Sequence, residues 1–121
     1  MDNIDWQHLL FAFDGRINRG KFWLGLVAIW VFGIVVGGVL GYIVYLISPT
    51  LAYLFWFVMY IAMIWIGLAV SIKRWHDRDK SGWWVLIGLV PLIGGLWALI
   101  EMGFLEGTSG DNDYGPDPLE T

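Results

Sequence analysis

Three long stretches without a charged residue dominate the chain, at residues 22–47, 51–72 and 83–100. A helix that crosses a bilayer needs about 20 apolar residues. Apolar side chains lie on every side of each stretch instead of alternating with polar ones, which favours lipid-facing helices over the strands of a barrel. The pattern therefore predicts an all-α integral membrane protein with three transmembrane helices.

The segments between these stretches are short and polar. Residues 48–50 contain a Ser-Pro pair, which favours a turn, so the first two helices should form a tight antiparallel hairpin. Pro91 lies between Gly88 and Gly95 and should kink the third helix. The last segment, residues 103–121, is rich in Gly, Asp and Pro and is expected to be an extended polar tail.

The N-terminal segment has a different pattern. Its apolar residues recur at intervals of three and four positions, namely Trp6, Leu9, Leu10 and Phe13. This spacing places them on one face of a helix that is too short to span a membrane. Residues 3–13 are therefore predicted to form a short amphipathic helix in the membrane interface, with Asn3 as its N-cap.

All Lys and Arg residues lie in two segments, one before the first stretch and one between the second and third. They are Arg16, Arg19, Lys21, Lys73, Arg74, Arg78 and Lys80. With three spans these two segments face the same side, which the positive-inside rule makes cytoplasmic. The N-terminus is therefore expected in the cytoplasm and the C-terminal tail on the periplasmic or extracellular side.

Composition agrees with a single membrane domain over residues 1–121. Hydrophobic residues make up 58% of the chain and charged residues 15%, compared with about a quarter charged in a soluble domain. The chain has no Cys, which excludes disulfides, thiol redox chemistry and thiolate metal sites. We expect no cofactor, no metal and no nucleic-acid partner.

Small residues repeat in the first span at Gly33, Gly37 and Gly41. Two overlapping GxxxG patterns allow helix backbones to approach closely. The glycines are predicted to form a helix-packing face, directed either at another helix of the same chain or at another subunit. Membrane lipids, a second copy of the chain or another membrane subunit are the partners that fit such a sequence.

The segment between the second and third spans has the densest chemistry. A candidate binding site for an anionic headgroup or partner combines it with the two N-terminal arginines: Arg16, Arg19, Lys73, Arg74, His76, Asp77, Arg78, Asp79 and Lys80. Arg matches phosphate because its planar donors bind two oxygens at once. The alternative is that these charges only fix the topology. No catalytic residue is assigned, because adjacent His and Asp residues rarely converge on one ion or substrate.

The pattern favours a non-enzymatic module that binds lipid or packs against a partner through its basic cytoplasmic face. An oligomeric small transporter or lipid-handling protein is the alternative. A pore needs a polar lining, and the spans carry no charged residue. An enzyme acting on headgroups is a weaker option.

Several motifs resemble one known family. They are FDGRINR at residues 13–19 running into Phe22-Trp23, IKRWHD at residues 72–77 followed by SGWW at residues 81–84, and Gly107-Thr108 with YGPDP at residues 114–118. In order and spacing they resemble the YhaH/YhaI-type small bacterial inner-membrane proteins, a family of unknown function. The resemblance covers nearly the whole chain. It implies a bacterial inner membrane and a multi-span helical fold, and it implies no activity.

Overall fold

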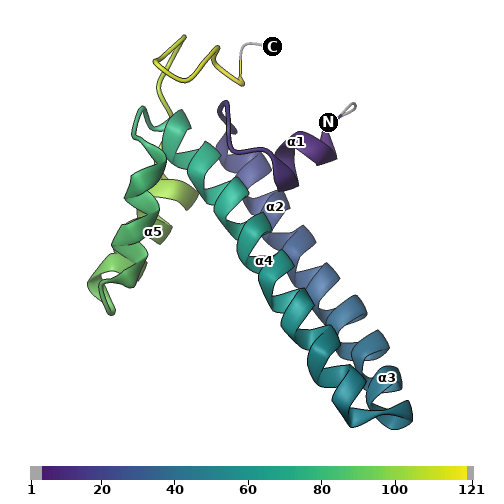
Figure 1. Ribbon diagram of the computed structural model, residues 1–121. Helices are drawn as coiled ribbons and strands as arrows, with labels where there is room; N and C mark the ends of the chain where they lie inside the picture. The colour runs from purple at the N-terminus through teal and green to yellow at the C-terminus, as the bar shows by residue number, and fades with distance from the viewer. Residues whose placement is uncertain (1–3, 120–121) are drawn as a thin grey trace.

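Two long antiparallel helices form the main body of the protein (Figure 1). The computed structural model describes residues 4–119. The first long helix has three consecutive parts: α2 (Arg19–Phe32), the π-helical segment η1 (Gly33–Leu40) and α3 (Gly41–Ile47). The second is α4 (Pro49–Asp77), whose N-cap Ser48 accepts a hydrogen bond from the Leu51 amide. Ser48 and Pro49 therefore form the tight turn that the sequence predicts.

Both long helices, Arg19–Ile47 and Pro49–Asp77, contain 29 residues and are apolar enough to cross a membrane. Most of their side chains are exposed; Trp30 is 70% and Ile47 is 77% accessible. Soluble monomers rarely expose an apolar surface of this extent. The hairpin therefore has the composition and the length of a membrane-embedded element.

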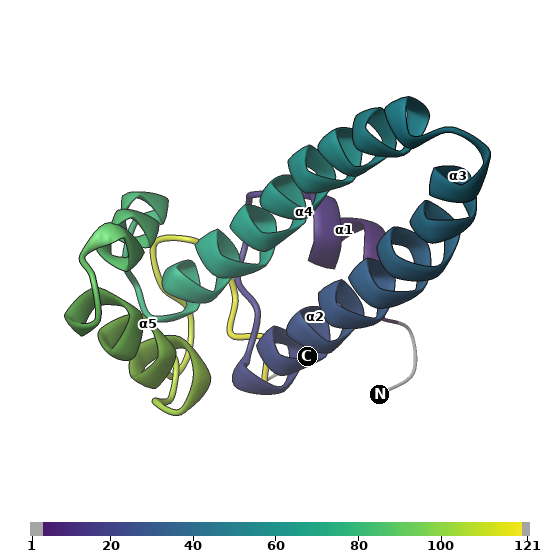
Figure 2. The same cartoon turned by 90° about the horizontal axis from the view of Figure 1, so that it is seen from below.

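The short helix α1 (Trp6–Phe11) packs across the start of this hairpin (Figure 2). It occupies only part of the predicted range 3–13, and Asn3 lies outside the described residues. Its N-cap is Asp5, whose side chain accepts from the His8 amide. Leu9 joins Ile17, Phe22 and Val70 in a small buried core. Part of the apolar face of α1 therefore packs against the rest of the protein and does not face lipid.

The structure differs from the prediction at the third apolar stretch. Residues 83–100 do not form one helix; they are divided between the 3₁₀ segment η2 (Gly82–Leu89) and α5 (Ile93–Gly103), which turn back on each other. Pro91 has no amide to continue a helix, and Leu92 adopts φ 65°, which reverses the chain. Sequence composition cannot distinguish this hairpin from a kinked span, because both are apolar throughout.

The tail also lies elsewhere than predicted. Residues 104–119 return to the end of the molecule that holds α1 and the basic residues (Figure 1). The sequence-based model of three spans placed the tail on the opposite side from these residues. The arrangement follows from the reversal at Leu92, which directs α5 back toward the start of α2.

Candidate functional site

We use the name polar cap for residues 14–21, 73–81 and 101–119, which meet at one end of the long hairpin. At its centre the carboxylate of Asp77 pairs with two arginines. Arg16 Nε and Nη2 both lie 3.0 Å from Asp77 Oδ1, and Arg74 Nη1 donates to Oδ2. All three side chains are almost fully buried. Buried charges of this kind persist only when they are paired and hydrogen-bonded.

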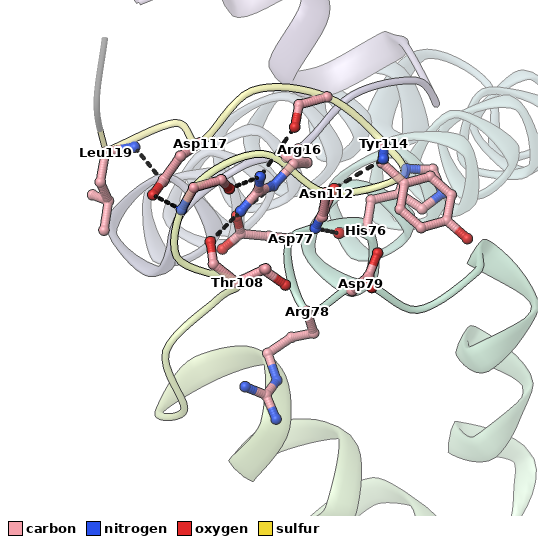
Figure 3. A network of polar contacts seen from close by, with 12 residues as sticks. Arg16, His76, Asp77, Arg78, Asp79, Thr108, Asn112, Tyr114, Asp117 and Leu119 are labelled. Atoms are coloured by element: carbon pink, nitrogen blue, oxygen red, sulfur yellow. Dashed lines mark hydrogen bonds and ion pairs between the residues drawn. The ribbon is translucent and has the colours of Figure 1, made fainter.

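Backbone carbonyls of the tail and of the end of α5 accept further hydrogen bonds from these arginines. Arg16 Nη1 donates to Gly110 O at 2.7 Å and to Gly115 O at 3.1 Å, and Nη2 donates to Thr108 O at 2.5 Å (Figure 3). Arg74 donates to Met102 O at 2.6 Å and to Leu105 O at 2.5 Å. The two guanidinium groups therefore hold the tail, and each of their nitrogens already donates to a protein group.

His76 lies on the other side of this network, next to the tail. Its Nδ1 lies 2.9 Å from Gly15 O, and its ring stacks on Tyr114 with ring centres 4.0 Å apart (Figure 3). The Asn112 side-chain amide donates to His76 O at 2.8 Å. Asp79, which has φ 60°, accepts from the Asp113 amide at 3.3 Å. His76 and Asp79 thus contact the tail rather than a shared space that could hold a substrate.

Lys73 is buried and attaches α1. Its ammonium donates to three carbonyls near the end of that helix, His8 O, Leu9 O and Ala12 O. Carbonyls at the end of a helix lack some of their intrahelical partners; the Ala12 amide donates to His8 O at 3.3 Å, and the lysine supplies a further donor to all three. Lys73 is therefore held by α1 and does not face the surface.

Arg78 and Lys80 both pair with Glu101 near the end of α5. Arg78 Nε lies 3.5 Å from Glu101 Oε2, and Lys80 donates to the same oxygen. Trp97 Nε1 donates to Oε1 at 2.9 Å. Lys80 also lies over the Trp84 ring, 4.8 Å from its centre. These contacts join the start and the end of the η2–α5 hairpin.

A pocket of about 300 Å³ opens between the start of α2 and the tail. It is lined by Asn18, Arg19, Gly20, Asp77, Glu106, Gly107, Thr108, Ser109, Asp117 and Leu119. Within the described chain Arg19 makes one hydrogen bond, from Nη1 to Phe104 O at 2.8 Å, and its side chain is exposed. Arg19 is thus the predicted basic residue that offers unused donors to the pocket.

Asp117 closes one wall of this pocket. Its carboxylate accepts from the Leu119 and Gly110 amides, each at 2.9 Å. These two hydrogen bonds favour the charged form and hold the pKa of Asp117 below its ordinary value. The tail turn is therefore stabilised by a carboxylate that is ionised at neutral pH.

The structure brings all nine residues of the predicted site to one end of the molecule, where most of them bind parts of the protein. Several of their partners in the tail and α5 were absent from the predicted site: Glu101, Glu106, Thr108, Asn112 and Tyr114. Among residues 4–119 no group of three His, Asp or Glu side chains could hold a metal ion. The Gly107-Thr108 and YGPDP motifs were the available signal, because they contain or adjoin most of these partners.

The three glycines of the predicted packing face lie toward α4. A Cβ on Gly33 would lie 3.1 Å from Met63, one on Gly37 3.7 Å from Met59, and one on Gly41 2.2 Å from Trp56 Nε1. Trp56 Nε1 donates to Gly37 O at 2.8 Å. In this chain the glycines accommodate the second helix of the hairpin.

An apolar helical hairpin with a charged, self-paired cap at one end defines a small helical membrane protein. Comparisons with known proteins agree. Residues 10–116 match the family described as "Protein of unknown function (DUF805)", and the chain belongs to it. It is 36% identical over 109 residues to the Escherichia coli K12 "Inner membrane protein YhaI", covering 88% of this chain and 86% of that protein.

Two further relatives come from the same organism. "Inner membrane protein YhaH" is 34% identical over 117 residues, covering 88% of this chain and 87% of the relative. "Uncharacterized protein YiiR" is 32% identical over 135 residues, covering 92% and 88%. No solved structure matches. The resemblance to the YhaH/YhaI-type proteins is confirmed, and the family is one of inner-membrane proteins of unknown function.

Proposed function

We propose that the protein is a non-enzymatic membrane module that binds a phospholipid headgroup in the pocket of its polar cap. The observation that carries this proposal is the exposed guanidinium of Arg19 at a 300 Å³ pocket beside the first turn of a membrane-length helix. The apolar part of that helix begins at Phe22, about one turn further along. A headgroup at this depth would leave its acyl chains beside the hairpin.

The chemistry of the pocket suits a phosphate group. Arg19 supplies planar donors, Thr108 and Ser109 contribute hydroxyl groups, and the first turn of α2 adds its helix dipole. Asn18 caps that helix by accepting from the Lys21 amide at 2.8 Å, which leaves Arg19 and Gly20 next to the pocket. The pocket thus receives a cationic donor from α2 and hydroxyl donors from the tail.

Carboxylates on the same pocket favour a headgroup with a positive part as well. Glu106 and Asp117 line it together with Arg19. The sequence suggested an anionic headgroup, but the arginines that would attract one, Arg16 and Arg74, donate to Asp77 and the tail. A zwitterionic phosphoethanolamine headgroup pairs its phosphate with Arg19 and its ammonium with Glu106.

Lipid analysis of the purified protein tests this function. The protein would be extracted from a bacterial inner membrane in mild detergent, and bound phospholipid measured by mass spectrometry and phosphorus content. Arg19→Gln should lower the bound phospholipid several-fold. Lys21→Gln is the matched control, because it removes the same charge two residues away without lining the pocket.

Glu106→Gln should retain phospholipid but shift it from ethanolamine toward glycerol headgroups. Equal phospholipid in the wild type, Arg19→Gln and Lys21→Gln proteins would refute the headgroup site. A loss of one co-purifying membrane protein, with lipid unchanged, would instead identify the pocket as a protein-docking site.

A further inference from the structure

We propose that the η2–α5 hairpin inserts tip-first into the leaflet next to the polar cap and does not cross the membrane. The chain then crosses twice, and the tail lies on the same side as the N-terminus. This inference does not depend on the headgroup pocket. It assigns a partner, the acyl chains of one leaflet, to the surface at the turn of the hairpin.

The lengths of the two arms support this assignment. At about 2.0 Å per residue the eight residues of η2 extend about 16 Å, and at about 1.5 Å per residue the eleven residues of α5 extend about 16 Å. The hydrocarbon core is about 30 Å thick. Each arm therefore reaches about half its depth, whereas a 29-residue helix reaches about 44 Å and crosses it fully.

Both ends of the hairpin are fixed to the polar cap. Glu101, near the end of α5, pairs with Lys80, just before η2, and this ion pair joins the two ends of the hairpin. Arg74 donates to Met102 O and Leu105 O, and Trp23 Nε1 donates to Gly103 O at 2.9 Å. The end of α5 is thus held at the level where α2 begins and α4 ends, which is the level of the membrane surface for the long hairpin.

The tip is apolar and exposed. Leu89 is 77%, Leu92 78% and Ile93 67% accessible, and Val90 is also exposed. At the base lie Trp83, Trp84 and Lys80, the residue types that anchor an element at a membrane interface. From base to tip, the hairpin surface changes from paired charges to tryptophans and then to exposed leucines. This order matches the change from lipid headgroups to acyl chains across a leaflet.

The backbone at the turn is suited to an apolar medium. Pro91 has no amide, the Ile93 amide donates to Pro91 O at 2.7 Å, and the Gly94 amide donates to Val90 O at 3.1 Å. Non-helical backbone at membrane depth requires such internal partners. Gly94 permits the close return of the chain, because a Cβ there would lie 1.8 Å from Ile87 O.

Single cysteines test the insertion directly, since the chain has no native Cys. Leu92→Cys and Leu89→Cys would each mark the tip, Thr50→Cys the turn between the long helices, and Asp111→Cys the tail. A membrane-impermeant maleimide would be applied to spheroplasts and to inside-out vesicles. A second reaction after detergent denaturation would show that every cysteine can react.

We expect Thr50→Cys to be labelled only in spheroplasts and Asp111→Cys only in inside-out vesicles. Both tip variants should stay unlabelled in spheroplasts and in inside-out vesicles, and should react after denaturation. Labelling of Asp111→Cys in spheroplasts would show a third span and overturn the proposal. Labelling of both tip variants in inside-out vesicles before denaturation would show a hairpin lying outside the bilayer and would also overturn it.

Discussion

Gly107 lies directly against the carboxylate of Asp77. A Cβ built on residue 107 would lie 1.9 Å from Asp77 Oδ2 and 2.8 Å from Asp77 O. The neighbouring Thr108 amide donates to that same carbonyl oxygen at 2.7 Å. Only glycine therefore lets the tail approach the carboxylate that pairs with Arg16 and Arg74.

Gly107→Ala should displace the tail from the polar cap. Overpacking a tight contact typically costs about 1–3 kcal/mol, and here the added methyl group meets a buried carboxylate that cannot move without breaking its ion pairs. Thermal unfolding in detergent should show a lower Tm. Gly20→Ala is the control, because its Cβ would make only an ordinary contact of 3.4 Å with Asn18; an equal Tm for the two variants would contradict this account.

Asp77→Asn should be strongly destabilising. It leaves the Arg16 and Arg74 charges buried without a counter-ion, and breaking a buried pair in this way costs about 3–5 kcal/mol. Asp79→Asn makes the same change two residues away, at an exposed residue whose positive φ suits Asn. Its stability should stay within about 0.5 kcal/mol of the wild type. Comparable losses in the two variants would show that Asp77 has no special role.

Gly41→Ala should weaken the packing of the long hairpin. The added Cβ would lie 2.2 Å from Trp56 Nε1, and moving the indole breaks its hydrogen bond to Gly37 O. The expected cost is about 1–3 kcal/mol. Gly38→Ala meets nothing within 4 Å and should be neutral or slightly stabilising in the helix. Thermal unfolding of the two variants side by side distinguishes a tight contact from a general effect of alanine.

Acid should release the turn of the tail around Asp117. Because the folded protein lowers the pKa of this carboxyl, its contribution to stability is fully present above the unfolded pKa and is lost as pH falls through the folded one. Hydrogen-exchange protection of the Gly110 amide should therefore hold at pH 6 and disappear in strong acid. Asp117→Ala should lack this protection at every pH; persistent protection in that variant would disprove the role of the carboxylate.

The sequence predicts the long hairpin well, because its signals are local. Two uncharged runs fix the helices, and Ser48 and Pro49 mark the turn between them. The glycine repeat also indicates a face that the structure places against α4. It does not reveal which glycine is most restricted: Gly37 is at the centre of the repeat, but Gly41 lies nearest its neighbour because Trp56 projects there.

The third apolar run could not be resolved in the same way. Its length allows one span or a hairpin, and Pro91 fits a kink as well as a turn. The outcome depends on Leu92 adopting a positive φ and on Gly94 lying under Ile87 O, neither of which leaves a periodic pattern. An apolar composition indicates that a segment lies in the membrane, but it does not indicate whether the segment crosses the membrane or turns back.

The structure places the basic residues of the predicted site at one end of the molecule, but the sequence does not predict their partners. Arg16 and Arg74 bind mostly to backbone carbonyls of residues 102–115, and a carbonyl has no sequence signature. Charge patterning therefore located the polar cap and overestimated how many of its cations are free. Arg19 could be singled out as open to a ligand only after the tail was placed.

The bonds of Arg16 have a consequence for how the protein is made. Its acceptors Thr108, Gly110 and Gly115 follow it in the chain by 92, 94 and 99 residues. A ribosome that has just inserted the first long helix leaves this arginine without its carbonyl partners until residues 108–115 have been translated. Arg16 can therefore complete its contacts only after both long helices and the η2–α5 hairpin have been made. A nascent chain that stalls before residue 102 would lack every carbonyl acceptor of Arg16 and Arg74 in α5 and the tail, and the two guanidinium groups would keep only their pairing with Asp77.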